Sequence, residues 1–238
     1  MLDHIVILTL EIFKPAIHSI MQRFCAGKQY QFVFSKQDMM DIREEVTKKS
    51  VLISFGNGFI VPEEVLNQFG AAYNFHPASP EYPGLHPHHF AALDQAKTFG
   101  AVCHHMTKEV DRGEIVFCQR FMVPPQSPWM VYLNLSLDQT FFLMEELFET
   151  LFIQNKHPKP CGETWGPKVY TKKDFDSACQ VPPDMNRENF ERLWRSLQTE
   201  HHKNVLYIDM HGHRFRYEKE SVEDNQYVHS SRMENKLN

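Results

Sequence analysis

The sequence predicts an α/β protein built around a mostly parallel sheet, and three observations indicate this class. Short apolar runs rich in β-branched or aromatic residues lie at residues 5–10, 30–34 and 51–55. Such runs are typical of strands that are buried on both faces of a parallel sheet. Segments with a helical spacing of apolar residues separate them. This alternation of strand and helix is the pattern of parallel strands joined by crossover connections.

Two helices are expected between these strands, which makes this half of the chain Rossmann-like. The helix over residues 13–24 has one apolar stripe, formed by Ile17, Ile20, Met21 and Phe24. The helix over residues 38–49 is polar with one apolar side, and we expect it to be exposed. No G-x-G-x-x-G motif follows the first strand, so a dinucleotide is not the expected cofactor.

A glycine-containing turn follows the third strand at residues 56–62 and leads into a helix expected over residues 63–69. Its two glycines would let the main chain approach a ligand closely. Pro62 and the acidic residues after it are typical of a helix start. The residues alone leave two interpretations open, a ligand-binding loop and a simple strand-to-helix turn.

Polar groups suited to catalysis gather in the central stretch, residues 73–116. Asn74 and His76 stand at the end of a predicted strand, before a loop rich in proline and glycine and a short helix over residues 88–96. Asp111 lies in an Asp-Arg-Gly turn before another apolar run. An amide, an imidazole and a carboxylate placed at strand ends and turns can converge on one cleft. That combination suits acyl transfer to an amine.

A further strand in this stretch carries two adjacent histidines, His104 and His105. Neighbouring residues of a strand point to opposite faces, so only one of them can face the cleft. We expect His104 to orient Asp111 by a hydrogen bond, with a satisfied core histidine as the alternative. His105 is expected on the opposite face.

The second half of the chain is predicted to add one more strand to the sheet and then to form a long helix. A strand is expected over residues 114–123 and a long helix over residues 133–153. The apolar residues expected to pack inward from this helix are Leu135, Leu137, Phe141, Phe142, Leu147 and Leu151.

A linker with two prolines at residues 155–160 divides the chain into a catalytic domain, residues 1–155, and a small α+β appendage, residues 156–238. The elements expected in the appendage are a helix over residues 186–197, an alternating strand over residues 204–210 and a frayed polar tail from residue 218.

Composition restricts the class of partner. The chain has 238 residues, 42% of them hydrophobic and 23% charged, which is ordinary for a globular protein. The formal net charge is −5, whereas proteins that grip nucleic acids through phosphates usually carry a basic face. We therefore expect small-molecule substrates and no DNA partner, and a tRNA partner is disfavoured. A homodimer stays open.

Cysteine usage and hydropathy indicate a cytoplasmic protein. The five cysteines are odd in number and show no paired spacing, so we interpret them as reduced thiols. The acidic start lacks the basic region of a signal peptide, and no apolar run is long enough to span a bilayer. No membrane association is expected.

The fourteen histidines raise the alternative of a metal site. They include a cluster at residues 86–89 and adjacent pairs at residues 104–105 and 201–202. No H-E-x-x-H motif is present, and adjacent histidines of a strand point apart. We therefore expect no functional metal.

Three linked motifs carry a family resemblance: Asn-Phe-His-Pro at residues 74–77, Gly-Ala-Val-Cys-His at residues 100–104 and Asp-Arg-Gly-Glu-Ile at residues 111–115. Their order and spacing resemble the signature of the formyltetrahydrofolate-dependent formyltransferases, which include the glycinamide ribonucleotide, methionyl-tRNA and nucleotide-sugar N-formyltransferases. The family's threonine is Val102 here, and the loop after His76 departs from the usual pattern.

The resemblance implies a formyltransferase fold and a set of site residues. N10-formyltetrahydrofolate would be the co-substrate, and no metal would be required. The catalytic residues would be Asn74, His76 and Asp111. The residues that would contact the folate are Phe59, Ile60, Val61, Gly84 and Gly113.

The expected chemistry assigns one task to each catalytic group. Asn74 and His76 would donate hydrogen bonds to the oxyanion that forms on the formyl carbon. Asp111 would take the surplus proton from the attacking amine. A carboxylate lodged between apolar walls would have its pKa raised toward neutrality, which suits that exchange.

The amine that accepts the formyl group is predicted from a looser resemblance, that of the C-terminal appendage. The short appendage resembles the tails of nucleotide-sugar formyltransferases, so an amino sugar linked to a nucleotide is the leading choice. The alternatives are another small amine, and water, which would make the protein a formyltetrahydrofolate hydrolase. A non-catalytic binding module is disfavoured by the intact set of three residues. The aromatic residues that could stack on a base or sugar, or else belong to the core, are Tyr82, Trp129 and Trp165.

Overall fold

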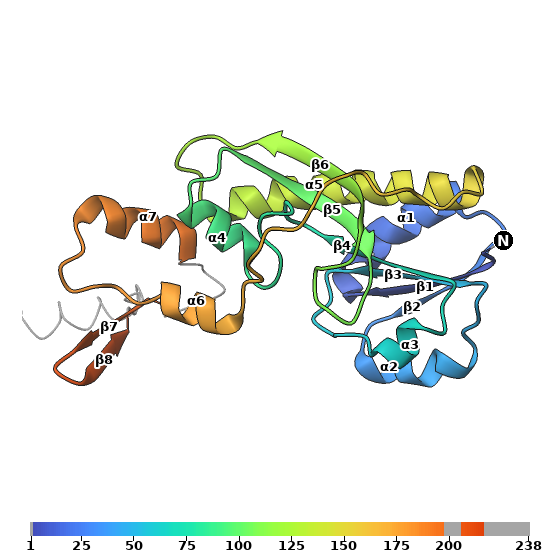
Figure 1. Cartoon of the computed structure of the whole chain (residues 1–238), viewed down its shortest axis with the longest axis horizontal. Coiled ribbons are helices and arrows are strands. Elements are labelled where there is room, and N and C mark those ends of the chain that lie inside the picture. Colours follow the sequence, from blue (N-terminus) through green and yellow to red (C-terminus); the bar gives the residue numbers. More distant parts are fainter. Residues whose placement is uncertain (1, 198–205, 217–238) are drawn as a thin grey trace, which may run out of the picture. The chain divides into compact units, whose positions relative to one another are not determined.

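The computed structural model describes residues 2–197 and 206–216 and contains a six-stranded sheet (Figure 1). In space the strands follow the order β2-β1-β3-β4-β5-β6. Their bounds are β1 His4–Thr9, β2 Gln29–Val33, β3 Ser50–Phe55, β4 Ala71–His76, β5 Thr98–His105 and β6 Ile115–Met122.

One strand of this sheet, β5, runs against the other five. Strands β2, β1, β3 and β4 pair in parallel, whereas β5 is antiparallel to both β4 and β6. The predicted α/β class with a mostly parallel sheet is therefore confirmed. Because β4 and β5 run in opposite directions, the carboxyl end of β4 lies beside residues in the middle of β5, and His76 pairs with Val102.

Helices cover both faces of the sheet (Figure 1). The helix bounds are α1 Lys14–Phe24, α2 Lys36–Asp41, α3 Glu63–Leu66, α4 Pro87–Leu93 and α5 Trp129–Phe148, with short 3-10 or π-helical segments at Glu11–Phe13, Ile42–Glu44 and Glu149–Ile153. The second helix begins earlier than predicted because Ser35 and Asp38 form a capping box. It also ends earlier, at Asp41, where the 3-10 segment begins, and Thr47 and Ser50 bond to each other in a turn before β3.

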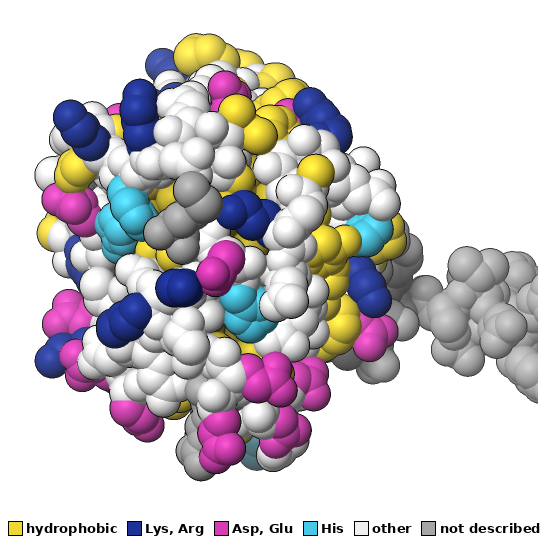
Figure 2. Space-filling view, turned by 90° about the vertical axis from the view of Figure 1, so that its right-hand side faces the viewer, with side chains coloured by type: hydrophobic (Ala, Val, Ile, Leu, Met, Phe, Trp, Pro, Cys, Tyr) yellow, Lys and Arg dark blue, Asp and Glu magenta, His cyan; other side chains and the backbone are white. Residues whose placement is uncertain are grey.

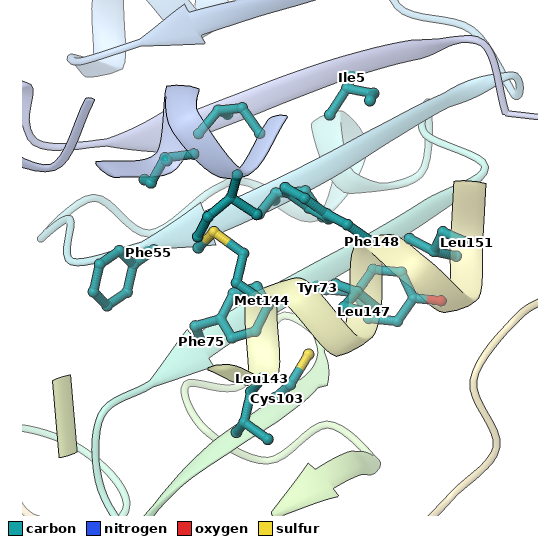
Figure 3. Packing of buried hydrophobic residues seen from close by; sticks show 14 of the residues in the cluster. Ile5, Phe55, Tyr73, Phe75, Cys103, Leu143, Met144, Leu147, Phe148 and Leu151 are labelled. Atoms are coloured by element: carbon teal, nitrogen blue, oxygen red, sulfur yellow. The ribbon is translucent and has the colours of Figure 1, made fainter. Parts of the chain in front are cut away.

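Two buried clusters lie on opposite sides of the sheet, because the side chains of each strand alternate between its faces. One cluster joins Ile5, Ile53 and Phe75 to apolar residues of α1 and α5 (Figure 3). The other joins Val6 and Leu52 to residues of α2 and α3. Strands β1 and β3 are thus buried on both faces, which explains their apolar runs, whereas β2 at the sheet edge is only partly buried.

One residue of the long helix does not pack as expected. Phe142 is 64% exposed, so its predicted inward position is wrong. Leu143 and Met144 enter the core instead, together with Leu147 (Figure 3). The helix begins at Trp129, earlier than predicted, and Tyr132 on its first turns is buried.

The chain divides into two compact units, Met1–Phe175 and Asp176–Asn238. Backbone hydrogen bonds from Cys161 and Gly166 hold the segment after the predicted linker within the first unit. The domain boundary at residue 155 stays a prediction. Helix α6 (Lys172–Ala178) crosses the division.

In the second unit the described elements are α7 (Arg187–Leu197) and a hairpin of β7 (Tyr207–Met210) and β8 (His213–Arg216). The small C-terminal α+β part is therefore present, although its strand begins at Tyr207. Residues 204–205 of the predicted strand, and the predicted tail from residue 218, lie outside the described residues. None of the helices in the described ranges is both long enough and apolar enough to cross a membrane.

Candidate active site

Three neighbouring strands place one polar side chain each in a row across the sheet. Ser54 of β3 is the register partner of Asn74 of β4, and Asn74 is in turn the partner of His104 of β5. Register partners point to the same face, so the three side chains lie side by side on the face that α2 and α3 cover farther along the strands. The row lies near the carboxyl end of β4, where α/β proteins commonly bind ligands.

Hydrogen bonds connect this row. The Ser54 hydroxyl donates to Asn74 Oδ1 at 2.8 Å, and Asn74 Nδ2 lies 3.1 Å from His104 Nε2. Asn74 is partly exposed, whereas Ser54 and His104 are buried. The amide is therefore held on both sides while one edge stays open to solvent.

Asp111 reaches the row from the turn before β6. Its Oδ2 is 3.4 Å from His76 Nδ1, and its Oδ1 is 3.4 Å from His104 Nε2. The Gly84 N–H donates to Oδ2 at 2.9 Å. The backbone of Asp111 has a φ of 46°, a left-handed conformation that aspartate tolerates better than most residues and that is often found at functional sites.

The structure thus brings together all four residues predicted for the catalytic site. Two histidines and a carboxylate, each no more than 7% exposed, meet beside the Asn74 amide. His105 points away from them and lies against Tyr73 on the opposite face, with ring centroids 4.7 Å apart.

One ring nitrogen of each histidine faces a backbone carbonyl oxygen, which determines which nitrogen faces Asp111. His76 Nε2 lies 2.9 Å from the Tyr82 carbonyl oxygen, and His104 Nδ1 lies 2.9 Å from the His105 carbonyl oxygen. A carbonyl can only accept, so these nitrogens carry the hydrogen. The other ring nitrogens, His76 Nδ1 and His104 Nε2, face the two oxygens of Asp111.

The expected rise in the pKa of Asp111 is wrong. Burial acts to raise this pKa, but the neighbouring His76 and His104 and the Gly84 N–H act in the opposite direction. Their combined effect is larger, so the pKa of Asp111 lies well below its usual range. Asp111 is therefore a carboxylate at neutral pH. Its negative charge, which the neighbouring His76 and His104 stabilise, is available to the proton of an attacking amine.

This lowered pKa predicts a loss of stability in acid. A group whose folded pKa is depressed contributes stability above its unfolded pKa, about 3.9 for aspartate, and loses it as the pH falls toward the folded value. We expect Asp111→Asn to lower the free energy of unfolding by about 2 kcal/mol at pH 7. The difference from the wild type should shrink below about pH 4. Urea denaturation from pH 7 to pH 3 measures it, and a difference that does not change with pH would contradict the assignment.

A segment that the sequence analysis did not connect with catalysis covers the cluster. The Trp165 ring lies against His76 and His104, with centroids 5.8 Å and 5.0 Å away, and its Nε1 donates to the Gly113 carbonyl. Arg112 holds the same segment by donating to two carbonyl oxygens, those of Gly166 and Pro167. No motif marks Trp165, which lies more than fifty residues after the last of the three.

Two of the predicted folate-contacting residues, Gly84 and Gly113, make backbone hydrogen bonds to residues of the catalytic cluster or to Trp165, which covers it. The Gly84 N–H is bonded to Asp111, and the Gly113 carbonyl accepts from Trp165. Gly84 has a φ of 99°, and a Cβ there would collide with the Tyr170 backbone. Contact of either glycine with folate stays a prediction, and in the protein alone these backbone groups hold the catalytic cluster.

Phe59, Ile60 and Val61, the other predicted folate contacts, lie on the loop between β3 and α3. Val61 is buried in the core, Ile60 is 63% exposed, and the Phe59 ring lies near the Lys36 ammonium. Within the described residues, the N–H groups of Ile60 and Val61 make no backbone hydrogen bond. A planar heterocycle with donors and acceptors at its edge could pair with such groups.

The histidine cluster at residues 86–89 does not resemble a metal centre. His88 Nε2 lies 2.7 Å from the Pro77 carbonyl oxygen, and burial lowers the pKa of His88 to about 3. His86 and His89 stack on Phe175 and Trp129. Among the residues that the structure describes, no group of three or more His, Cys, Asp or Glu side chains is arranged to hold a metal ion.

The fold and the cluster together define an α/β enzyme with an acyl-transfer type of site. Residues 14–129 match the family model described as formyl transferase, so this part of the chain is similar to that family. The family resemblance predicted from the three motifs is therefore confirmed, and with it the prediction of a formyltransferase enzyme. A search among curated proteins gives no match to the sequence.

Solved structures of N-formyltransferases share the fold. A sugar N-formyltransferase from a Shewanella species is 18% identical, with a TM-score of 0.70 over 93% of this chain and 98% of that chain. A 4-N formyltransferase from Francisella tularensis is 19% identical, with a TM-score of 0.66 over 93% and 99%. An N-formyltransferase from Helicobacter canadensis, in complex with folinic acid and dTDP-3-aminofucose, is 13% identical, with a TM-score of 0.65 over 89% and 85%. The formyltransferase fold predicted from the sequence is confirmed.

Proposed function

We propose that this enzyme moves a formyl group from N10-formyltetrahydrofolate to the primary amine of a nucleotide-linked amino sugar. The observation that carries the transfer step is the cluster of Asn74, His76, His104 and Asp111 within the family-matched segment. An amide donor, an acid–base pair and a partly open edge are what attack of an amine on a formyl carbon requires.

Each group has a task in this transfer. The Asn74 amide nitrogen donates to the oxyanion that forms when the amine attacks, and preorganised donors of this kind each contribute roughly 3 kcal/mol. Asp111 Oδ1 accepts the surplus proton of the amine nitrogen, because Oδ2 is already bonded to Gly84. Asp111 then delivers a proton to the departing folate nitrogen, while His76 Nδ1 faces its other oxygen, Oδ2, at 3.4 Å.

Two features of the first unit suit a folate as the formyl donor. The loop at residues 56–62 exposes Ile60 and leaves main-chain N–H groups available at its edge. It lies next to the row of polar side chains, because Asn57 bonds to Ser54. A pterin bound at this loop would bring the formyl nitrogen toward Asn74. Among proteins of the same fold, the Helicobacter canadensis enzyme binds folinic acid, and HypX from Aquifex aeolicus binds tetrahydrofolic acid.

The choice of a nucleotide-linked amino sugar as acceptor is supported by charge and by the structural neighbours. The formal net charge of the chain is −5. On the face shown in Figure 2, basic side chains are interspersed with acidic ones, and the acidic side chains gather along the lower edge of that face. A tRNA must be held through several phosphates, whereas a nucleotide-linked sugar carries only a diphosphate. The Shewanella neighbour is a sugar N-formyltransferase, and the Helicobacter canadensis N-formyltransferase was solved in complex with dTDP-3-aminofucose.

A competition experiment tests the acceptor. The purified enzyme receives N10-formyltetrahydrofolate with a labelled formyl group, together with nucleotide-linked 3-amino and 4-amino sugars, glycinamide ribonucleotide and initiator methionyl-tRNA. We expect label on at least one nucleotide-linked amino sugar and none on the tRNA, because the chain carries a net negative charge. Label on the tRNA alone would refute this acceptor.

The same assay separates transfer from hydrolysis. A hydrolase would release labelled formate at the same rate with and without an amine. We expect formate release without acceptor to be slow. Asn74 and Asp111 could serve water as well as an amine, so the comparison with and without amine is what separates the two reactions. Rapid formate release that no amine suppresses would replace the proposed transfer by hydrolysis.

A further inference from the structure

The Asn74 side chain lies within a line of hydrogen bonds that begins outside the three motifs. The Phe59 N–H donates to Asn57 Oδ1 at 2.9 Å, and Asn57 Nδ2 donates to Ser54 Oγ at 2.7 Å. The Ser54 hydroxyl then donates to Asn74 Oδ1 at 2.8 Å. Ser54 and Asn57 belong to none of the motifs, yet they stand between the loop at residues 56–62 and the catalytic amide.

The chemistry of the donors fixes the direction of this line. A backbone N–H can only donate, so Asn57 must turn its oxygen to Phe59 and its amino group to Ser54. The Ser54 hydroxyl accepts from Asn57 and has its single proton left for Asn74. The Asn74 oxygen therefore faces Ser54, and its amino group faces away from β3.

The other end of the line gives the same orientation. His104 Nδ1 carries the hydrogen because it faces the His105 carbonyl oxygen, so when the ring carries a single hydrogen Nε2 is an acceptor. Nε2 lies 3.1 Å from the Asn74 amide and therefore needs an amino group there. Of the two amide hydrogens of Asn74, one bonds to His104 and the second is left for the substrate.

We propose that Ser54 and Asn57 are positioning residues that hold the Asn74 amide with its amino group toward the reacting formyl group. The reversed amide would present an oxygen to the developing oxyanion and repel it. The orientation depends on the main-chain N–H of Phe59, so the loop proposed to bind the folate also determines which way the Asn74 amide is turned. This inference rests on the proposed function for the role of Asn74.

Two substitutions disturb the line in different ways. Asn57→Asp keeps the size of the side chain but replaces its donor by an acceptor, so the Ser54 hydroxyl turns to the new carboxylate. Ser54→Ala removes the hydroxyl. We expect both variants to lower kcat about 10- to 100-fold, with the KM of folate and amine changed by less than about threefold. Ser54→Thr keeps the hydroxyl and should restore kcat to within about threefold of the wild type.

The matched control is Asn67→Asp, the same chemical change at an exposed position, which should leave kcat unchanged. Thermal unfolding separates positioning from folding, because a variant that melts like the wild type but turns over slowly has lost alignment alone. Wild-type kcat in both Ser54→Ala and Asn57→Asp would overturn the proposal. So would a loss in Ser54→Ala that Ser54→Thr does not restore.

Neutron diffraction from deuterium-exchanged crystals of the free protein tests the orientation without any substrate. We expect deuterium on Ser54 Oγ pointing to Asn74 Oδ1, and on Nδ1 but not Nε2 of His104. An Asn74 oxygen facing His104 would overturn the inference. If this pattern is found but the enzyme formylates no amine, the proposed function fails and the arrangement of the amide stands.

Discussion

Replacing Asp111 by asparagine should nearly abolish formyl transfer. The amide of Asp111→Asn can still accept from the Gly84 N–H, so the turn is retained. It cannot take a proton from the attacking amine, and it removes the negative charge between His76 and His104. General acid–base groups typically contribute 10²–10⁴-fold, so we expect kcat to fall about 10³-fold while KM changes by less than about threefold.

Steady-state kinetics with the labelled formyl donor measures this effect, and Glu109→Gln is its control. Glu109 lies two residues before Asp111, is exposed, and undergoes the same loss of charge. We expect Glu109→Gln to keep the wild-type kcat. If Asp111→Asn retained more than about a tenth of the wild-type kcat, Asp111 would not be the proton acceptor, and His76 would have to take that role.

The sheet could be predicted from the sequence because the strands β1 and β3 are buried by the two clusters and leave apolar runs. Helix ends were less predictable. The second helix begins at a capping box of Ser35 and ends in a 3-10 segment, and neither feature interrupts the apolar pattern on which the prediction depended. The exposed position of Phe142 was not predicted for a similar reason. The spacing of apolar residues does not say which of two neighbouring residues faces the sheet.

The candidate site could be predicted as far as its motifs extend. Asn74 and His104 are thirty residues apart in the chain but are register partners, because β4 and β5 pair in antiparallel fashion after a connection that contains α4. Trp165 and Ser54 carry no motif, and they reach the cluster only through folding. The direction of the pKa shift of Asp111 was mispredicted because it depends on neighbours at distant positions, His76 and Gly84, and not on adjacent apolar residues.

A methyl group at Gly113 should damage both the fold and the site. A Cβ built on Gly113 collides with the carbonyl oxygen of His105, and this oxygen accepts from His104 Nδ1. Relief of the collision must therefore displace the backbone that fixes the His104 ring, beside the carbonyl that holds Trp165. We expect Gly113→Ala to lower the free energy of unfolding by about 3 kcal/mol, as overpacking of a buried site does.

The surviving folded enzyme should also be slower, with kcat lowered at least about tenfold, because small displacements of catalytic groups are costly. Gly58→Ala is the matched control, since a Cβ at Gly58 would meet no heavy atom within 4 Å. Its free energy of unfolding should stay within about 0.5 kcal/mol of the wild type. Urea denaturation and kinetics on both variants measure the two effects. If Gly113→Ala were as stable and as fast as Gly58→Ala, the His105 carbonyl could not be the group that orients His104, and the orientation assigned to the Asn74 amide would lose one of its two supports.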